Sequence, residues 1–342
     1  MPSPSLRRGL RALGATLGTI VGLVVVVLAI VIVHGLVIGA QSFEAQRAHL
    51  ATRSAEPVPG WVDESVEPGT REDARFDELQ FTGSHNSYAT EPTWLQLAVI
   101  ELADGSGDTL RYSHADLSTQ LDAGIRAIEL DVRDHGDRFS NTHVPLLANA
   151  GTAPDFALAL EELRMWSDAH PGHAPIVVQL ELKDDYAFLD LTTRAWNADG
   201  FARLDAVIAE RLGGRVFAPA DLQAAGEWPT LGELRGRFVL YFDSSDVARE
   251  TLGFGSAEVF VSGPDAAFVV LNDPADPAIP AAVAAGQIVR TRADADLRVD
   301  PAERDAAIAS GATIVSTDFP PSEPGPDGYA VEFGGGHLVR ER

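Results

Sequence analysis

The chain has 342 residues, of which 45% are hydrophobic, and it carries a formal net charge of −24 at pH 7 and no cysteine. This length suffices for one large domain or two small ones. The lack of cysteine excludes disulfides, thiolate metal ligands and a cysteine nucleophile. The acidic charge argues against nucleic acid as a partner, because it repels phosphates.

Residues 13–40 form an almost entirely apolar segment, and its centre, Ile20–Val33, contains no charged residue. A helix of this length can cross a hydrocarbon layer of about 30 Å. The segment therefore predicts a transmembrane anchor. A cleaved signal peptide, which would leave the protein secreted, is the alternative, but its apolar core would usually be only about 7–15 residues long.

Charges on the two sides of this segment predict its orientation. Arg7, Arg8 and Arg11 precede it, within residues 1–12, and Glu44 is the first acidic residue after it. The positive-inside rule then places the basic N-terminus in the cytoplasm and the rest of the chain outside the cell membrane. The sequence does not define an oligomeric state.

Residues 41–75 are rich in charge and proline and predict a linker or a helix next to the membrane, followed by one domain over residues 76–342. In this domain, near-continuous apolar runs alternate with helical patterns, which predicts parallel strands buried on both faces. Eight strands are predicted: Leu79–Thr82, Ala127–Val132, Ile176–Leu182, Phe238–Phe242, Phe268–Asn272, Ile288–Arg290, Thr313–Ser316 and Tyr329–Phe333.

Three of the intervening helices have recognisable ends. One runs from Ser118 into Gly124, one covers Asp155–His170, and one begins with the N-cap Asp300 and ends at Gly311. Eight strands over about 260 residues predict an α/β fold, a (β/α)8 TIM-like barrel preceded by one N-terminal transmembrane helix. An open doubly wound sheet is the alternative, but no glycine-rich nucleotide loop follows the first strand.

Polar residues gather where the first three predicted strands end, which in a barrel is the end where loops converge on a site. They are His85 and Asn86 after the first strand, Glu129 and Asp131 in the second, His143 beyond it, and Glu181 and Lys183 at the end of the third. Glu129 and Asp131 are two residues apart and share one face of a strand, so their carboxylates repel unless a cation lies between them. Together with Asn86 and Glu181 they make an all-oxygen donor set, which favours Ca²⁺ over Zn²⁺.

At these positions the sequence resembles the calcium-dependent phosphoinositide-specific phospholipase C-like proteins of bacteria, whose catalytic domain is a TIM barrel. The resemblance covers roughly residues 76–340. It rests on Gly83-Ser-His-Asn-Ser-Tyr88, Gln120-Leu-Asp-Ala-Gly-Ile-Arg126, Glu129-Leu-Asp131, His143, Val178-Gln-Leu-Glu-Leu-Lys183, Arg290-Thr-Arg-Ala-Asp294 and Val315-Ser-Thr-Asp-Phe319.

The resemblance implies that His85 and His143 are the catalytic pair and that the four oxygen-bearing side chains, Asn86, Glu129, Asp131 and Glu181, are the calcium ligands. Lys183, Arg290 and Arg292 are expected to contact the substrate, since cationic side chains suit phosphate.

Each of these residues also has a purely structural interpretation. His143 could be a loop histidine bonded to Asn141 or backbone, Glu181 and Lys183 could form an ion pair, and Arg290 and Arg292 could pair with Asp294 or Asp296. Asp318 could be a site residue or a cap.

The function predicted from these features is a calcium-dependent phosphodiesterase that cleaves a phosphoinositol-type phospholipid to diacylglycerol and a cyclic or open inositol phosphate. Glu129 or Glu181 would accept the proton of the inositol 2-hydroxyl, His85 would donate to the transition state, and His143 would protonate the leaving oxygen.

Two alternatives remain. One is a glycerophosphodiester phosphodiesterase-type hydrolase on the same barrel, although the His-Arg-Gly start of that family is missing. The other is a non-catalytic, membrane-displayed binding module.

Overall fold

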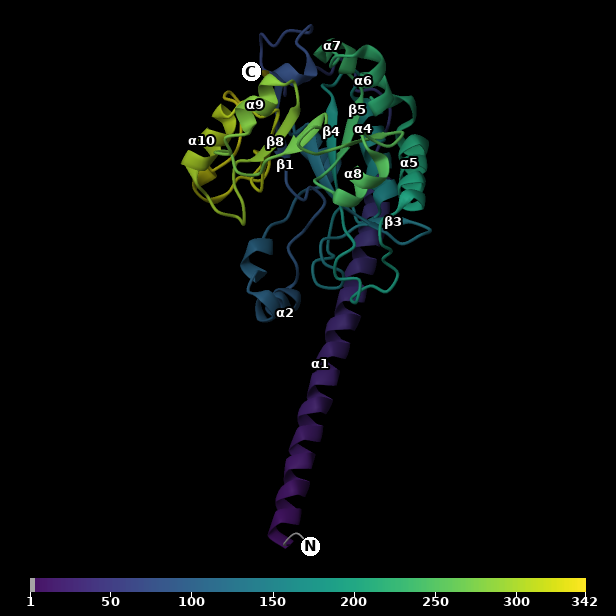
Figure 1. Cartoon of the computed structure of the whole chain (residues 1–342), viewed down its shortest axis with the longest axis vertical. Coiled ribbons are helices and arrows are strands. Elements are labelled where there is room, and N and C mark those ends of the chain that lie inside the picture. The colour runs from purple at the N-terminus through teal and green to yellow at the C-terminus, as the bar shows by residue number, and fades with distance from the viewer. Residues whose placement is uncertain (1–3) are drawn as a thin grey trace.

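The computed structural model of the protein describes residues 4–342 and shows a barrel of strands and helices carried on one long N-terminal helix (Figure 1). The barrel strands are β1 (Leu79–Ser84), β2 (Ala127–Asp134), β4 (Ile176–Leu182), β5 (Phe238–Phe242), β6 (Val259–Val261), β7 (Phe268–Val270), β8 (Ile288–Arg292) and β9 (Ile314–Thr317). They run in parallel in the order β6-β5-β4-β2-β1-β9-β8-β7.

The two ends of this sheet, β6 and β7, meet at one isolated parallel bridge between Ser262 and Phe268. The barrel is therefore nearly closed, and the predicted TIM-like fold is confirmed. Two short antiparallel strands extend the sheet: β3 (Phe139–Asn141) pairs with β2, and β10 (Val339–Glu341) pairs with β1.

One predicted strand is wrong. Residues Tyr329–Phe333 form no strand, and the missing barrel strand is β6 (Val259–Val261). Val331 and Phe333 are buried in a small apolar cluster beside β9, so this segment looks like a strand in sequence although it only covers the barrel. Strand β6 was missed because it has just three residues and gives little signal.

Alternate residues of the strands face two different cores. Val177 and Val239 belong to the cluster that fills the barrel, whereas their neighbours Val178 and Leu240 pack against the outer helices. Both faces are therefore buried, which explains the continuous apolar runs in the sequence.

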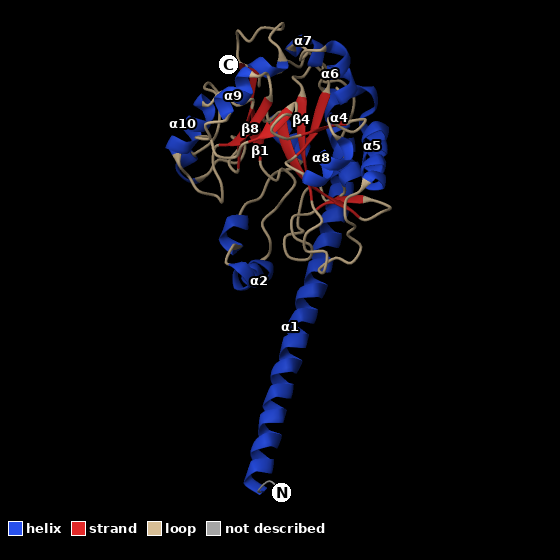
Figure 2. Ribbon diagram, viewed as in Figure 1, coloured by secondary structure: helices blue, strands red, loops and turns tan. Residues whose placement is uncertain are grey.

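The helices lie outside the strands and surround them (Figure 2). The predicted helices are confirmed as α3 (Leu117–Asp122), α4 (Phe156–Ala169) and α10 (Pro301–Ala309), the last with both capping bonds to Asp300. The others are α2 (Trp94–Asp104), α5 (Ala198–Leu212), α6 (Pro219–Ala225), α7 (Leu231–Leu234), α8 (Asp246–Leu252) and α9 (Ile279–Ala284), with 3-10 turns at Phe76–Glu78, Gly107–Leu110, Gly213–Arg215 and Pro326–Gly328.

Helix α1 (Pro4–Leu50) contains the whole apolar segment predicted over residues 13–40 and continues into the predicted linker. Of the predicted basic N-terminus, residues 1–3 lie outside the described residues. From Thr16 to Leu50 the helix is long and apolar enough to cross a membrane, with a mean hydropathy of 3.1 in its most apolar window.

The two parts of α1 have different surroundings. All side chains from Thr16 to Ile30 are exposed, whereas beyond them a stripe at every third or fourth residue is covered by the barrel domain. Val31, Gly35 and Gln46 are the buried members of that stripe. The helix is therefore exposed and apolar from Thr16 to Ile30, and from Val31 onward one of its faces packs against the domain.

Candidate active site

The predicted site residues converge at the end of the barrel where the parallel strands terminate. They line one cavity of about 320 Å³, which holds His85, Asn86, Glu129, His143, Glu181, Lys183, Arg290 and Arg292, with Asp318, Asp243, Asn272 and Tyr112 among the other lining residues. Asp131, the one remaining predicted residue, is fully buried and in contact with His143 and Lys183.

A larger hollow of about 920 Å³ lies at the opposite end of the barrel. Of its charged groups, Arg75 bonds to Asp77 and Arg342 bonds to the Asp77 carbonyl. The strand-end cavity is therefore the one with chemistry to offer.

Three carboxylates form a cluster in the strand-end cavity. Oxygen atoms of Glu129, Asp131 and Glu181 lie within 4.8 Å of one another. The pairing of β2 with β4 produces this arrangement, because it sets Asp131 directly beside Glu181. Such a concentration of negative charge suits a divalent cation.

The oxygen atoms left over fit that cation. Oδ1 of Asp131 and Oδ1 of Asn86 are both buried, and neither has a hydrogen-bond partner within residues 4–342. Buried polar atoms are normally bonded, so each has room for another partner. Nδ2 of Asn86 donates to the Tyr112 hydroxyl at 2.7 Å, which fixes the amide and leaves its oxygen free.

Two of the predicted substrate-binding cations bond to this cluster in the structure. Lys183 Nζ lies 2.5 Å from Glu181 Oε1 and 3.6 Å from Asp131 Oδ2. Arg290 donates to Glu129 Oε2 at 2.9 Å. The Glu181–Lys183 ion pair considered from sequence is therefore present, and Arg290 pairs with Glu129 rather than with Asp294 or Asp296.

The cluster's pKa values reflect burial against these cations. Burial raises the pKa of Glu129 and of Glu181, and nearby positive charges offset only part of that rise. Burial also acts on Asp131, but there Lys183 and His143 outweigh it and hold the pKa well below its usual range. Asp131 therefore favours its ionised form, while the raised pKa values of the two glutamates make them the better proton acceptors.

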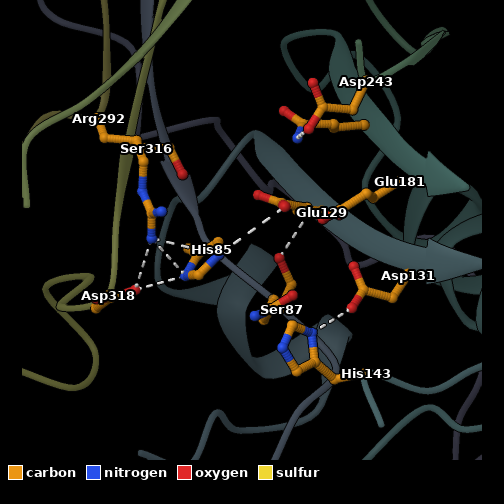
Figure 3. A network of polar contacts seen from close by, with 12 residues as sticks. His85, Ser87, Glu129, Asp131, His143, Glu181, Asp243, Arg292, Ser316 and Asp318 are labelled. Atoms are coloured by element: carbon orange, nitrogen blue, oxygen red, sulfur yellow. Dashed lines mark hydrogen bonds and ion pairs between the residues drawn. The ribbon is translucent and has the colours of Figure 1, made fainter. Parts of the chain in front are cut away.

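Each predicted catalytic histidine bonds to a carboxylate through Nδ1 (Figure 3). His143 lies 2.7 Å from Asp131 Oδ2, which also accepts the Tyr88 hydroxyl at 3.1 Å. His85 lies 2.6 Å from Asp318 Oδ1. A carboxylate on Nδ1 orients each ring and leaves Nε2 of His143 for the substrate, whereas Nε2 of His85 also lies 3.3 Å from Arg292 Nη2.

Asp318 and Arg292 form one unit with His85. Arg292 Nη2 lies 2.9 Å from His85 Nδ1 and 3.6 Å from Asp318. Burial would raise the pKa of Asp318, but His85 and Arg292 lower it to about 2. Asp318 is therefore a negatively charged partner of His85, and its second oxygen accepts the backbone N–H of Leu297 at 3.1 Å, so it makes both of the contacts considered from the sequence.

Other residues at the site were missed by the sequence analysis. Asp243 and Asn272 follow β5 and β7, so the strand-end rule could have found them. Tyr112 belongs to an irregular segment with no strand signal. Arg133 is buried and donates to the His143 carbonyl at 2.6 Å and to Asp185 Oδ1 at 2.7 Å, a positioning role that no sequence pattern indicates.

A TIM-like barrel with two histidine–carboxylate pairs around an acidic cluster is the arrangement of a metal-assisted barrel hydrolase. Residues 74–151 and 141–342 match the family model described as "Phosphoinositide phospholipase C, Ca2+-dependent". The chain therefore belongs to the Ca²⁺-dependent phosphoinositide phospholipase C family, and the resemblance found in the sequence is confirmed. The Ca²⁺ dependence of the family agrees with the oxygen donors of the site.

Similar proteins support this assignment. A "PI-PLC X domain-containing protein 1" of the fungus Arthroderma benhamiae is 28% identical over 179 residues, which are 50% of this chain and 48% of that protein. The chain thus spans about half the length of this curated relative.

Two solved structures share the fold. A calcium-dependent phosphoinositol-specific phospholipase C from a Pseudomonas species has a TM-score of 0.59 at 19% identity, covering 82% of this chain and 99% of that one. A Ca²⁺-dependent phosphatidylinositol-specific phospholipase C from Streptomyces antibioticus has a TM-score of 0.51 at 20% identity, covering 72% of this chain and 95% of that one.

Proposed function

We propose that the protein is a calcium-dependent phosphodiesterase that cleaves a phosphoinositol-type phospholipid into diacylglycerol and a cyclic inositol phosphate, which water can then open. The observation that carries this proposal is the pairing of two histidines with separate carboxylates around one acidic cluster. The arrangement offers a proton acceptor, a hydrogen-bond donor and a proton donor around one reacting phosphate.

The residues that would hold calcium are Asn86, Glu129, Asp131 and Glu181. When bound there, the ion would polarise a phosphate oxygen and make the inositol 2-hydroxyl more acidic. The free oxygens of Asn86 and Asp131 and the 4.8 Å cluster support this assignment.

The remaining steps belong to side chains of the protein. Glu129 or Glu181, whose pKa values are raised by burial, takes the proton of the inositol 2-hydroxyl as that oxygen bonds to phosphorus. His85 donates a hydrogen bond to the charge that develops on the phosphate. His143 gives its proton to the glycerol oxygen as the phosphorus–oxygen bond breaks.

We propose that Lys183, Arg290 and Arg292 bind the substrate, because their positive charges attract its phosphate. Arg292 is the best placed for a direct contact, because it lines the cavity beside His85. Arg290 and Lys183 act first on the carboxylates to which they bond.

We also propose that α1 is an uncleaved anchor and that the domain lies outside the membrane. The apolar part of the helix from Thr16 to Val33, in which Val31 is the one buried residue, is about 27 Å long at the rise of an α-helix, close to the thickness of a bilayer's hydrocarbon layer. The membrane surface would then lie between Val31, where the domain begins to cover the helix, and His34.

The mouth of the barrel faces the same way as the anchor. Helix α2 follows β1 and lies beside α1 in Figure 1, and His34 bonds to Thr93 at the start of α2. Large apolar side chains are exposed on α2 and on the loop after β4: Trp94 is 80% exposed, Leu102 89%, Phe188 75% and Leu191 90%. These residues suit contact with lipid around the mouth.

Incubation of the full-length protein with phosphatidylinositol in mixed micelles, with Ca²⁺ or with chelator, tests the proposal by phosphorus NMR of the water-soluble product. A cyclic inositol phosphate that forms only with Ca²⁺ is the expected result. A phosphomonoester signal in the lipid phase, with no phosphorus in the water-soluble product, would mean that the head-group alcohol leaves without phosphate and would favour the glycerophosphodiesterase alternative. Calcium binding without turnover would identify a binding module.

A further inference from the structure

We propose that helix α1 is a structural part of the active site, because its residues 34–39 hold the loop that carries His143. This inference rests on the proposed function for the role of His143, but its packing argument stands separately. The His143 loop is defined as residues 143–149, between β3 and α4. The α1 residues concerned are positioning residues, since they act through the loop.

Close packing of the loop on α1 requires glycine. A Cβ on Gly35 would lie 2.5 Å from the carbonyl oxygen of Leu146 and 2.8 Å from its Cα, and a Cβ on Gly39 would lie 2.9 Å from Asn149 Nδ2. The contact at Gly35 is with backbone, which cannot turn away as a flexible side chain can. Gly18 and Gly22, in the same helix, have no atom within 4 Å of such a Cβ.

A chain of hydrogen bonds fixes the same loop between α1 and α2. Asn149 Nδ2 donates to the Gly35 carbonyl at 2.9 Å, and its Oδ1 accepts from Gln96 Nε2 at 2.9 Å. Gln96 Nε2 also donates to the Leu146 carbonyl at 2.8 Å. Gln96 accepts from the backbone of Thr93, whose hydroxyl lies 2.7 Å from His34 Nε2. Two helices therefore clamp the far end of the loop.

The loop needs such support. Leu146 has a φ of 65°, a left-handed conformation that a leucine adopts only when its surroundings impose it. At the near end, Arg133 holds the His143 carbonyl from inside the domain. The His143 loop is thus held at one end by Arg133 of the barrel and at the other by Gly35 of α1.

Movement of α1 would therefore change the position of His143 relative to Asp131 and to the substrate. A misplacement of about 1 Å at a catalytic group can cost roughly a hundredfold in rate. An anchor that only retained the enzyme at the membrane would not need this contact. A fragment that begins at residue 41 lacks His34, Gly35 and Gly39, and it should lose activity even on a soluble substrate.

The test compares Gly35→Val with Gly22→Val in the full-length protein in detergent micelles. Both variants put the same side chain on the same helix, but only the first meets the His143 loop. Asn149→Ala removes the loop's bonds from the other side and covers the case in which Gly35→Val does not fold. The readouts are kcat and KM on a short-chain phosphoinositol diester and the hydrogen exchange of residues 143–149.

Gly35→Val and Asn149→Ala should lower kcat by roughly tenfold to a hundredfold with little change in KM, while Gly22→Val keeps the wild-type rate. The loss should shrink on a substrate with a nitrophenol leaving group, which needs little protonation from His143. Exchange should quicken in residues 143–149. An equal loss on both substrates, or wild-type kcat and exchange in both loop variants, would overturn the inference. A wild-type enzyme without phosphodiesterase activity would refute the proposed function instead, and the exchange comparison would still test the packing.

Discussion

His85 and His143 each bond to a carboxylate through Nδ1, at 2.6 Å and 2.7 Å, but they rest on different parts of the molecule. His85 follows β1 directly, and its partner Asp318 follows β9, the strand that pairs with β1. His143 lies on a loop outside the barrel, and its partner Asp131 belongs to the acidic cluster.

The two histidines of the site are therefore supported in different ways. The His85 side is built into the barrel framework and has its own carboxylate and arginine. The His143 side uses a carboxylate of the acidic cluster, and we propose that packing of the His143 loop on α1 sets its position. We therefore expect changes to the metal site, the His143 loop or the anchor helix to impair the function of His143 more than that of His85.

The largest effects are expected from the histidines themselves. His143→Ala and His85→Ala should each lower the rate by on the order of 10²–10⁴, the range for a lost proton-transfer partner. A nitrophenol leaving group should rescue only His143→Ala, because it needs no general acid. The measurement is kcat on alkyl and nitrophenyl diesters. Rescue of His85→Ala alone would reverse the roles, and equal rescue would erase the distinction.

Asp131→Asn should come next, because it damages the histidine pair and the metal cluster together. We expect weaker Ca²⁺ binding and lower activity, with partial recovery at higher Ca²⁺. In the wild type, Ca²⁺ at a hundred times its Kd should stabilise the fold by about 2.7 kcal/mol. Melting temperature and turnover across a calcium titration measure both effects. Full activity in chelator with no change in melting would contradict the metal site.

Asp318→Asn is the matched change on the His85 side. It should lower kcat by roughly tenfold without altering the calcium dependence of melting, since Asp318 belongs to no part of the acidic cluster. Isothermal calorimetry with Ca²⁺ beside steady-state rates would check it. A shift in calcium affinity as large as that of Asp131→Asn would remove the distinction between the two sides.

The Asp318 carboxylate also gives the wild type a dependence of stability on pH that the Asp318→Asn variant lacks. The folded-state pKa of Asp318 is about 2, below the ordinary aspartate value of 3.8, so its ionised form stabilises the fold. That contribution, about 2 kcal/mol, is complete above pH 4 and is lost as the pH falls towards 2. Denaturant unfolding of wild type and Asp318→Asn should therefore differ near neutral pH and converge in acid. A constant difference would refute the lowered pKa.

The smallest effects are expected at the exposed aromatic residues beside the mouth. Trp94→Ser and Phe188→Ser should reduce hydrolysis of vesicle lipid a few-fold, since the anchor still holds the protein to the membrane. Activity on a soluble short-chain diester should not change. Equal losses on both substrates would point to damage within the site instead of lost lipid contact.

Sequence alone could predict the barrel and the residues on its strand ends, because parallel strands buried on both faces leave continuous apolar runs that end in polar residues. His85, Glu129, Asp131 and Glu181 were found in this way. Residues that hold the His143 loop, such as Arg133 and Asn149, were not found, because their contacts form only when segments distant in the sequence meet. Strand β6 was too short to give a strand pattern. Tyr329–Phe333 showed a strand pattern because Val331 and Phe333 are buried against the barrel, although the segment forms no strand.

The packing between α1 and the His143 loop could not be predicted from the sequence either. Gly35 and Gly39 look in sequence like ordinary small residues of an apolar helix. Only the position of Leu146 and Asn149 against them shows why a larger side chain would not fit.

Because α1 is one unbroken helix from Pro4 to Leu50, an enzyme anchored by it works in two dimensions. With the proposed anchor, the mouth of the barrel would stay at a constant height above the membrane, so the rate should follow the mole fraction of substrate in the leaflet and not the amount of lipid per volume of medium. The proposed product diacylglycerol would remain in that leaflet, so each enzyme molecule would deplete the substrate around it. Lateral diffusion of fresh lipid into this depleted region would then set the sustained turnover.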